Sequence, residues 1–179
     1  PALVRVLADN ALSGAEWLRD DVKVEFEDYL LFFGGHSVKR SLVPKDASGA
    51  ELIKKLEKKA KDSKVTILTE ADAKKINASN GKEFDQVEAK VNDKDVTFTA
   101  KDGIVIASGG FGSNLEMRKK YNKDMDEKIL ATTSAGSMGD GILIGEAIGA
   151  GTTDMEYIQT YPTCDPETGR LLYVGDVRM

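Results

Sequence analysis

Apolar residues near the N-terminus of this chain recur at helical spacing. They predict a first amphipathic helix, whose apolar side is formed by Leu3, Val4, Leu7, Ala8 and Ala11. Ser13 and Glu16 form a capping-box pair, which predicts that a second helix begins there. Ser48 and Glu51 form another such pair and predict a helix that ends near Asp62, with its lysine-rich side in solvent. The expected buried stripe of that helix consists of Leu52, Ile53 and Leu56.

Strands are predicted where apolar and polar residues alternate, or where apolar residues form short runs. Alternation over residues 22–26 predicts a short half-exposed strand, and the aromatic run 29–33 after it is expected in the core. Residues 65–68 predict another strand. The next segments predict a β-meander, made of the alternating residues 70–76, a turn at Asn80-Gly81, and a hairpin that joins 84–91 to 96–100.

The next strand candidate, residues 104–106, is followed by small residues. It is too apolar for either side to face water, so a buried strand is expected. Gly109 and Gly110 follow it, and paired glycines at the end of a strand let a ligand approach the backbone closely. Further along, Gly139-Asp140-Gly141 leads into a predicted helix over 142–148. Such a turn exposes N–H groups that suit phosphate or a polyol, and an ordinary glycine turn is the alternative interpretation.

Composition narrows the class of protein. At 179 residues, with 41% hydrophobic and 31% charged residues, the chain is expected to be globular with a core of its own. The net charge of −5 argues against nucleic acid as a partner, and no apolar run approaches the ~20 residues of a membrane span. Cys164 and His36 are single residues of their types, so neither an internal disulfide nor a metal site is predicted. A cytoplasmic location is predicted, with a trimmed signal peptide as the open alternative.

Three motifs occur in a fixed order along the second half of the chain. They read ASGGF at 107–111, GDG at 139–141 and DMEYIQTYPT at 154–163. As a set, they resemble the flavoprotein fumarate reductase superfamily, which includes succinate dehydrogenase flavoprotein subunits, soluble fumarate reductases and urocanate reductases. The resemblance covers most of the chain. Two departures are Ser108, where the family usually has Thr, and Tyr161, where it usually has His.

The resemblance implies a mixed α/β fold, the second half of a glutathione-reductase-type FAD-binding domain with a β-meander. Residues 1–155 would form this partial domain, and 156–179 would begin a substrate-capping domain that is expected to be disordered in isolation. The superfamily's N-terminal dinucleotide fingerprint, G-x-G-x-x-G, does not occur in this sequence. We therefore expect a fragment whose partners are the missing N- and C-terminal parts of the same chain, and which alone binds FAD weakly or not at all.

The resemblance also implies FAD as cofactor and assigns residues to it. Gly109 and Gly110 would pass next to the flavin, and Gly139 and Asp140 would form the turn that contacts FAD. A short carboxylate at a helix N-terminus can accept a hydrogen bond from a ribityl or ribose hydroxyl, although an ordinary helix cap is the alternative for Asp140. Ala73 matches the position of a backbone contact to adenine.

Substrate and proton-transfer residues follow from the same resemblance. Tyr161 stands where a His binds a substrate carboxylate in fumarate-type enzymes, and Arg178 matches an arginine of the catalytic proton relay. Asp176 is displaced by one residue from the Glu of that relay. A Tyr with an Asp at this distance resembles urocanate reductases, where the pair holds the imidazole ring. A packed Tyr161 and a solvated Asp176 are the structural alternative.

The activity implied for the full-length protein is reduction of the activated C=C bond of a small unsaturated carboxylate by hydride transfer from flavin. The isolated fragment is expected to be inactive. Two alternatives stay open. One is a relative of L-aspartate oxidase or the ketosteroid dehydrogenases, and the other is a non-catalytic interaction domain whose glycines only form turns. A yellow chromophore that co-purifies with the full-length protein would separate the flavoproteins from the interaction domain.

Overall fold

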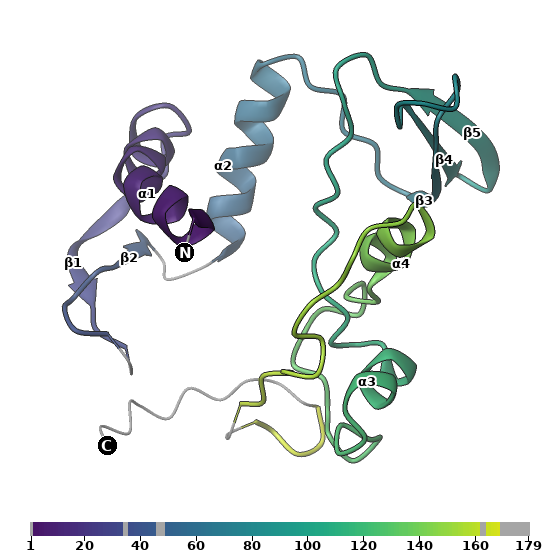
Figure 1. Cartoon of the computed structure of the whole chain (residues 1–179). Helices are drawn as coiled ribbons and strands as arrows, with labels where there is room; N and C mark the ends of the chain where they lie inside the picture. The colour runs from purple at the N-terminus through teal and green to yellow at the C-terminus, as the bar shows by residue number, and fades with distance from the viewer. Residues whose placement is uncertain (1, 34–35, 46–48, 162–163, 169–179) are drawn as a thin grey trace. The chain divides into compact units, whose positions relative to one another are not determined.

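The computed structural model describes residues 2–33, 36–45, 49–161 and 164–168 (Figure 1). The described part divides into two compact units, one ending at Ile67 and the other beginning at Leu68. Helices and small antiparallel sheets occur together, which confirms the predicted mixed α/β class. The finer assignment to a glutathione-reductase-type domain stays a prediction.

The first unit begins with one long helix, α1 (Ala2–Asp20), of 19 residues. The prediction of two helices is therefore wrong. The hydroxyl of Ser13 donates to the carbonyl of Asn10 at 3.0 Å, a bond inside a continuous helix, instead of capping a new one. None of the α1 side chains is buried, and Leu3 and Leu7 are 84% and 73% exposed.

A two-stranded antiparallel ribbon follows, formed by β1 (Phe26–Leu31) and β2 (Ser41–Pro44). The strand lies later than predicted, because Val22 and Val24 precede it in irregular backbone, where both are buried. Most of the aromatic run 29–33 is exposed, so its expected place in the core is wrong. A ribbon of two strands has few neighbours to cover it, which leaves such side chains at the surface.

Helix α2 (Gly49–Asp62) ends where the sequence predicts. Its lysine-rich side is largely solvated and carries i,i+4 ion pairs, such as Lys61 with Glu57 at 2.5 Å. Of the predicted stripe, Leu52 and Leu56 are half-buried, but Ile53 is 63% exposed and does not belong to it. The predicted cap Ser48 lies outside the described residues.

The second unit contains the predicted meander, a three-stranded antiparallel sheet in the order β3-β4-β5. Its strands are β3 (Ala71–Asn77), β4 (Gln86–Val91) and β5 (Lys94–Thr99). The turn at Asn80-Gly81 is confirmed, with Gly81 at a φ of 70° and the Asn80 side chain accepting from the Lys82 N–H at 2.9 Å. Asn92 and Asp93 form the tight β4–β5 turn, with φ values of 48° and 62°.

Two predicted strands are not strands in the structure, namely residues 65–68 and 104–106. Val105 is 90% exposed and Ile106 is 46% exposed, so the expected buried strand is wrong. A buried strand needs hydrogen-bonded neighbours, and within the described residues neither segment pairs with one. Local apolar character alone therefore does not place these segments in a sheet.

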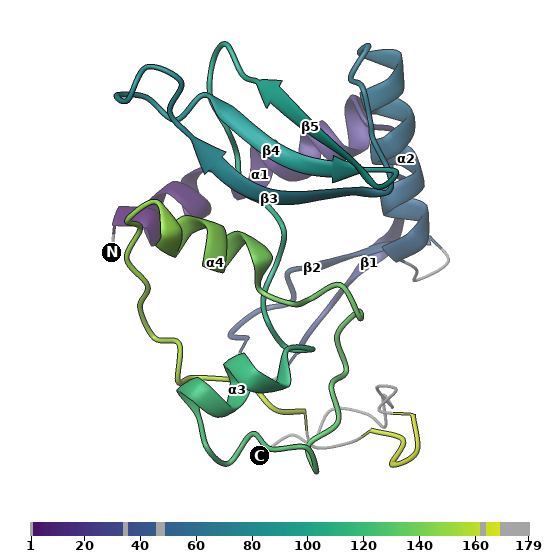
Figure 2. The same ribbon diagram turned by 90° about the vertical axis from the view of Figure 1, so that its right-hand side faces the viewer.

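Two short helices complete the second unit, α3 (Leu115–Tyr121) and α4 (Asp140–Ala147). The side chain of Asn114 caps α3 by accepting from the Met117 N–H at 3.0 Å. Helix α4 begins at the predicted Gly139-Asp140 turn and lies beside β3 (Figure 2). This contact brings the glycine turns close to the meander, where the candidate site is formed.

Candidate functional site

Hydrogen bonds join the two glycine turns that the sequence singles out. The N–H of Gly139 donates to the carbonyl of Gly110 at 3.1 Å. Two residues later, the N–H of Gly141 donates to the hydroxyl of Ser108 at 3.0 Å. Ser108, seen in the sequence only as a departure from Thr, therefore satisfies one of the free N–H groups at the start of α4.

The glycines of the two turns serve different purposes. A Cβ on Gly141 would lie 2.3 Å from the Ser108 hydroxyl, and one on Gly139 would lie 2.6 Å from the sulfur of Met117. These two glycines therefore permit close packing. At Gly109 and Gly110, no heavy atom lies within 4 Å of an added Cβ. This pair leaves its backbone open to a ligand.

A cavity of about 320 Å³ brings two predicted cofactor residues together, because Ala73 and Asp140 both line it, along with Ser108. Ala73 stands at a bulge of β3, where the register shifts before Lys75. An adjoining cavity of about 310 Å³ is lined by Gly109 and shares Ser108 with the first. Residues far apart in the sequence thus form one continuous surface around the start of α4.

The Asp140 carboxylate is available for a ligand. It is exposed in the first turn of α4, where the helix dipole favours negative charge. It makes no hydrogen bond or ion pair with another residue of the described part of the chain. A carboxylate in this position can accept hydrogen bonds from the hydroxyls of a sugar or polyol.

The predicted substrate residue Tyr161 lies on a different cavity of the same unit. This cavity has a volume of about 550 Å³ and is lined by segments 127–133 and 158–161 and by Arg118. The Tyr161 side chain is 39% exposed. Asp176 and Arg178 lie outside the described residues, so the predicted pairing of Tyr161 with Asp176 stays a prediction.

Arg118 is the residue of this cavity that sequence reasoning missed. It is only 7% exposed, and one of its terminal nitrogens donates to the carbonyl of Ile129 at 2.8 Å. In the sequence it precedes Lys119 and Lys120, a basic run that indicates a solvated helix end. Its burial depends on how segment 122–131 returns across α3, for which no local pattern gives a signal.

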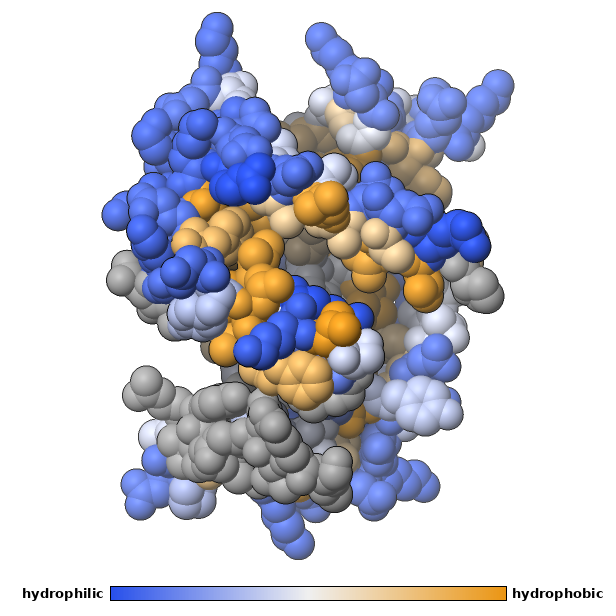
Figure 3. All heavy atoms as spheres, turned by 90° about the vertical axis from the view of Figure 1, so that its left-hand side faces the viewer, coloured by the Kyte–Doolittle hydropathy of each residue, from blue (hydrophilic) through white to orange (hydrophobic). Residues whose placement is uncertain are grey.

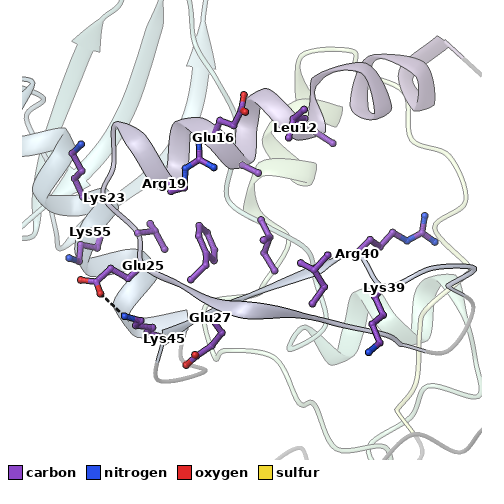
Figure 4. Close-up of a pocket in the computed structure, with 16 residues that line it drawn as sticks. Leu12, Glu16, Arg19, Lys23, Glu25, Glu27, Lys39, Arg40, Lys45 and Lys55 are labelled. Carbon is purple, nitrogen blue, oxygen red and sulfur yellow. Dashed lines mark hydrogen bonds and ion pairs between the residues drawn. The ribbon is translucent and has the colours of Figure 1, made fainter.

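A larger cavity, of about 950 Å³, lies within the first unit between α1 and the β1–β2 ribbon (Figure 4). Its lining includes the apolar residues Leu12, Val24 and Phe26 and charged residues such as Lys39 and Arg40. Of the predicted site residues that the structure describes, none lines it. Size alone therefore does not mark the candidate site.

Within the described residues, no group of three or more His, Cys, Asp or Glu side chains could hold a metal ion. Among those same residues, no helix has both the length and the apolar character needed to cross a membrane.

Comparison with known proteins identifies the family. The FAD binding domain family matches residues 1–176. The chain belongs to this family. Within it, the chain is a member of the flavoprotein fumarate/urocanate reductase superfamily, which confirms the resemblance seen in the motifs.

Individual relatives agree with this assignment. Urocanate reductase of Eggerthella lenta is 47% identical over 182 residues, covering 100% of this chain and 30% of that protein. NADH:acrylate oxidoreductase of Vibrio harveyi is 33% identical over 174 residues, covering 95% of this chain and 17% of that protein. The open conformation of a flavocytochrome c3 fumarate reductase superposes with a TM-score of 0.87 at 28% identity, covering 95% of this chain and 30% of that one. The chain thus spans about a third or less of the length of these relatives.

The family indicates FAD as the cofactor, and the residues around α4 fit part of it. The open backbone at Gly109 and Gly110 admits close approach of a large planar or phosphate-bearing group. The unpaired Asp140 carboxylate beside it offers an acceptor for sugar hydroxyls. These features could supply contacts along one side of such a cofactor.

Proposed function

We propose that this chain is part of an FAD-dependent reductase that saturates the activated C=C bond of a small unsaturated carboxylate. The observation that carries the proposal is the 47% identity to a protein named urocanate reductase over the whole of this chain. Relatives named for acrylate and fumarate support the same substrate class. A bound flavin would supply the hydride for such a reduction.

In this proposal, the chain's own residues position the cofactor. The glycines at 109 and 110 hold open backbone against it. The turn of Gly139 and Asp140 contacts it, with Gly139 packed closely behind and Asp140 accepting from its hydroxyls, and the backbone at Ala73 contacts the adenine. Support comes from the cavity that Ala73 and Asp140 share and from the hydrogen bond that joins Gly139 to Gly110. Arg178 is proposed to relay a proton toward the substrate carbon.

Tyr161 and Asp176 are proposed to select the substrate. A phenol can donate one hydrogen bond and flank a flat ring, whereas a carboxylate can accept from an imidazole N–H. Fumarate would place a second carboxylate near Asp176, where like charges repel. Urocanate or a similar aryl acrylate is therefore the proposed substrate in preference to fumarate.

We also propose that exposed apolar side chains of this chain are covered by the rest of a longer flavoprotein. Figure 3 shows apolar side chains at the surface among hydrophilic ones. The exposed apolar residues of the described part of the chain include Leu3 and Leu7 of α1, and Val105 of the expected strand, which is 90% exposed. Burying such surface is favourable, and buried strands need partners on both sides. The proposed division is an FAD-binding part up to residue 155 and the start of a capping domain from 156.

The test is a comparison of kcat/KM for urocanate, acrylate and fumarate in the intact flavoprotein with a chemically reduced electron donor. Urocanate is expected to be preferred over fumarate, and Tyr161→His is expected to move that preference toward fumarate by about ten- to a hundredfold. Reduction of none of the three acids, with oxidation of L-aspartate or dehydrogenation of a ketosteroid instead, would overturn the proposal. A protein purified without flavin that takes up none would point to an interaction domain.

A further inference from the structure

Among the described residues, the positive charge of Arg118 lacks a carboxylate partner. The residue is 93% buried, the complement of its 7% exposure, and it takes part in none of the ion pairs found within the described residues. Its guanidinium donates from one terminal nitrogen to the neutral carbonyl of Ile129, and its Nε–H is buried without an acceptor. A buried charge is costly unless an opposite charge compensates it. The site therefore calls for an anion.

The cavity beside Arg118 is suited to receive one. Of the charged residues on its wall, Arg118 and Lys128 are positive, and Glu127 is negative. The Glu127 carboxylate is already paired with the ammonium group of Lys119 at 3.6 Å, and Lys119 does not line the cavity. With Glu127 paired to Lys119, the remaining charge of the described lining is positive.

Hydrogen-bond donors and apolar surface share this cavity. The Ser113 hydroxyl donates to the Ser134 carbonyl at 2.8 Å, so the Thr133 hydroxyl must be the donor in its 2.9 Å contact with Ser113. Thr132, Thr160 and Tyr161 carry the other hydroxyls of the wall. The rest of the wall is largely apolar and includes Ile129, Leu130 and Ile158. A small organic acid matches this mixture better than inorganic phosphate, which needs donors on every side.

We propose that Arg118 is the charge partner of a small organic carboxylate that binds in the cavity formed by segments 127–133 and 158–161. The terminal nitrogens of the guanidinium meet the carboxylate oxygens, the hydroxyl of Tyr161 or Thr132 donates to one of them, and the hydrocarbon part of the acid packs on Ile129, Leu130 and Ile158. Charge-assisted hydrogen bonds of this kind are the strong ones in proteins.

The inference deepens the proposed function. It rests on that function in one respect, namely that the bound carboxylate is the unsaturated substrate. Binding itself does not depend on turnover. Propionate serves as the probe, because it is a small, unreactive carboxylate, and propionamide serves as its uncharged isostere. Both are titrated against the isotope-labelled intact protein, and NMR follows the signals of Ile129, Thr132 and Ile158.

Propionate is expected to shift these signals, whereas propionamide is expected to leave them unchanged at the same concentration. Arg118→Gln should weaken propionate binding about tenfold or more, since it removes the charge and the forked donor. Arg118→Lys should recover part of the affinity. Lys120→Gln is the matched control, because it removes the same charge from α3 at a residue that does not line the cavity. This control is expected to bind propionate like the wild type.

Equal binding of propionate and propionamide by the wild type would overturn the inference, whether or not any variant folds. So would unchanged affinity in a folded Arg118→Gln protein. In the intact flavoprotein, Arg118→Gln should raise KM for acrylate much more than it lowers kcat. Charge-dependent propionate binding without any reductase activity would support the Arg118 site and refute the proposed function. Reductase activity without propionate binding would support the proposed function and refute the Arg118 site.

Discussion

Replacing Gly141 by alanine tests the packing that joins the two glycine turns. The new Cβ would lie 2.3 Å from the hydroxyl oxygen of Ser108 and 2.5 Å from the Cγ2 methyl of Ile106. Contacts this short require movement. Ile106 is β-branched and stiff, so Ser108 is expected to rotate away and lose its 3.0 Å hydrogen bond from the Gly141 N–H.

The expected cost combines three effects. Overpacking costs about 1–3 kcal/mol, and the lost hydrogen bond costs about 0.5–1.5 kcal/mol. Alanine offsets about 0.5–1 kcal/mol of this, since glycine is a poor helix former. We therefore expect Gly141→Ala to destabilise the start of α4 by about 1–3 kcal/mol. Gly145→Ala is the matched control in the same helix, because its Cβ would lie 3.6 Å from the Cβ of Ala150, an ordinary contact.

Amide hydrogen exchange of residues 143–147 measures the effect where it occurs. Protection in Gly141→Ala should fall about 5- to 150-fold, whereas Gly145→Ala should keep or slightly increase it. Adding Ser108→Ala to Gly141→Ala removes the shortest contact, so the double variant should be less destabilised than the two single effects together. Equal protection in the Gly141→Ala and Gly145→Ala chains would show that the close packing of α4 on Ile106 and Ser108 is not present in solution.

Three further predictions concern the cofactor surface and the meander. The Cβ of Gly110→Ala would meet no atom within 4 Å, so the stability of the variant should stay within about 0.5 kcal/mol of wild type. Its affinity for FAD in the intact flavoprotein should fall about tenfold or more, which flavin fluorescence during FAD release would measure. Unchanged affinity would remove Gly110 from the proposed site. Asp93→Gly relieves a positive φ of 62° and should stabilise the chain by about 0.5–1 kcal/mol in urea unfolding, whereas Asp95→Gly in the adjoining strand should destabilise it. Hydrogen bonds from the Ser79 hydroxyl and N–H lower the pKa of Asp85 below its ordinary 3.8. The resulting stabilisation of the turn is present above pH 3.8 and is lost as pH falls through the lower folded pKa, and NMR titration should show that Ser79→Ala raises this pKa toward its ordinary value.

Features that depend only on residues close together in the sequence were determined by the sequence itself. The end of α2 at Asp62, the turn at Asn80-Gly81 and the hairpin around Asn92 all follow from local propensity, side-chain alternation and turn chemistry. The start of α4 at the Gly139-Asp140 turn belongs with them. Motif order was also enough to identify the flavoprotein superfamily, since each motif keeps its residues regardless of how the rest of the chain folds.

Features that depend on contacts between distant segments were decided by the tertiary structure. Ser13 was expected to cap a helix but lies inside one, and Ile106 was expected in a sheet but packs where α4 begins, with no strand beside it in the described part of the chain. Arg118 belongs to a basic run typical of a solvated helix end, yet segment 122–131 buries it, and no carboxylate among the described residues pairs with its charge. Burial and strand pairing are properties of two segments at once. The pattern of one segment can show that it is apolar or charged, but only its partner in space decides whether it is covered.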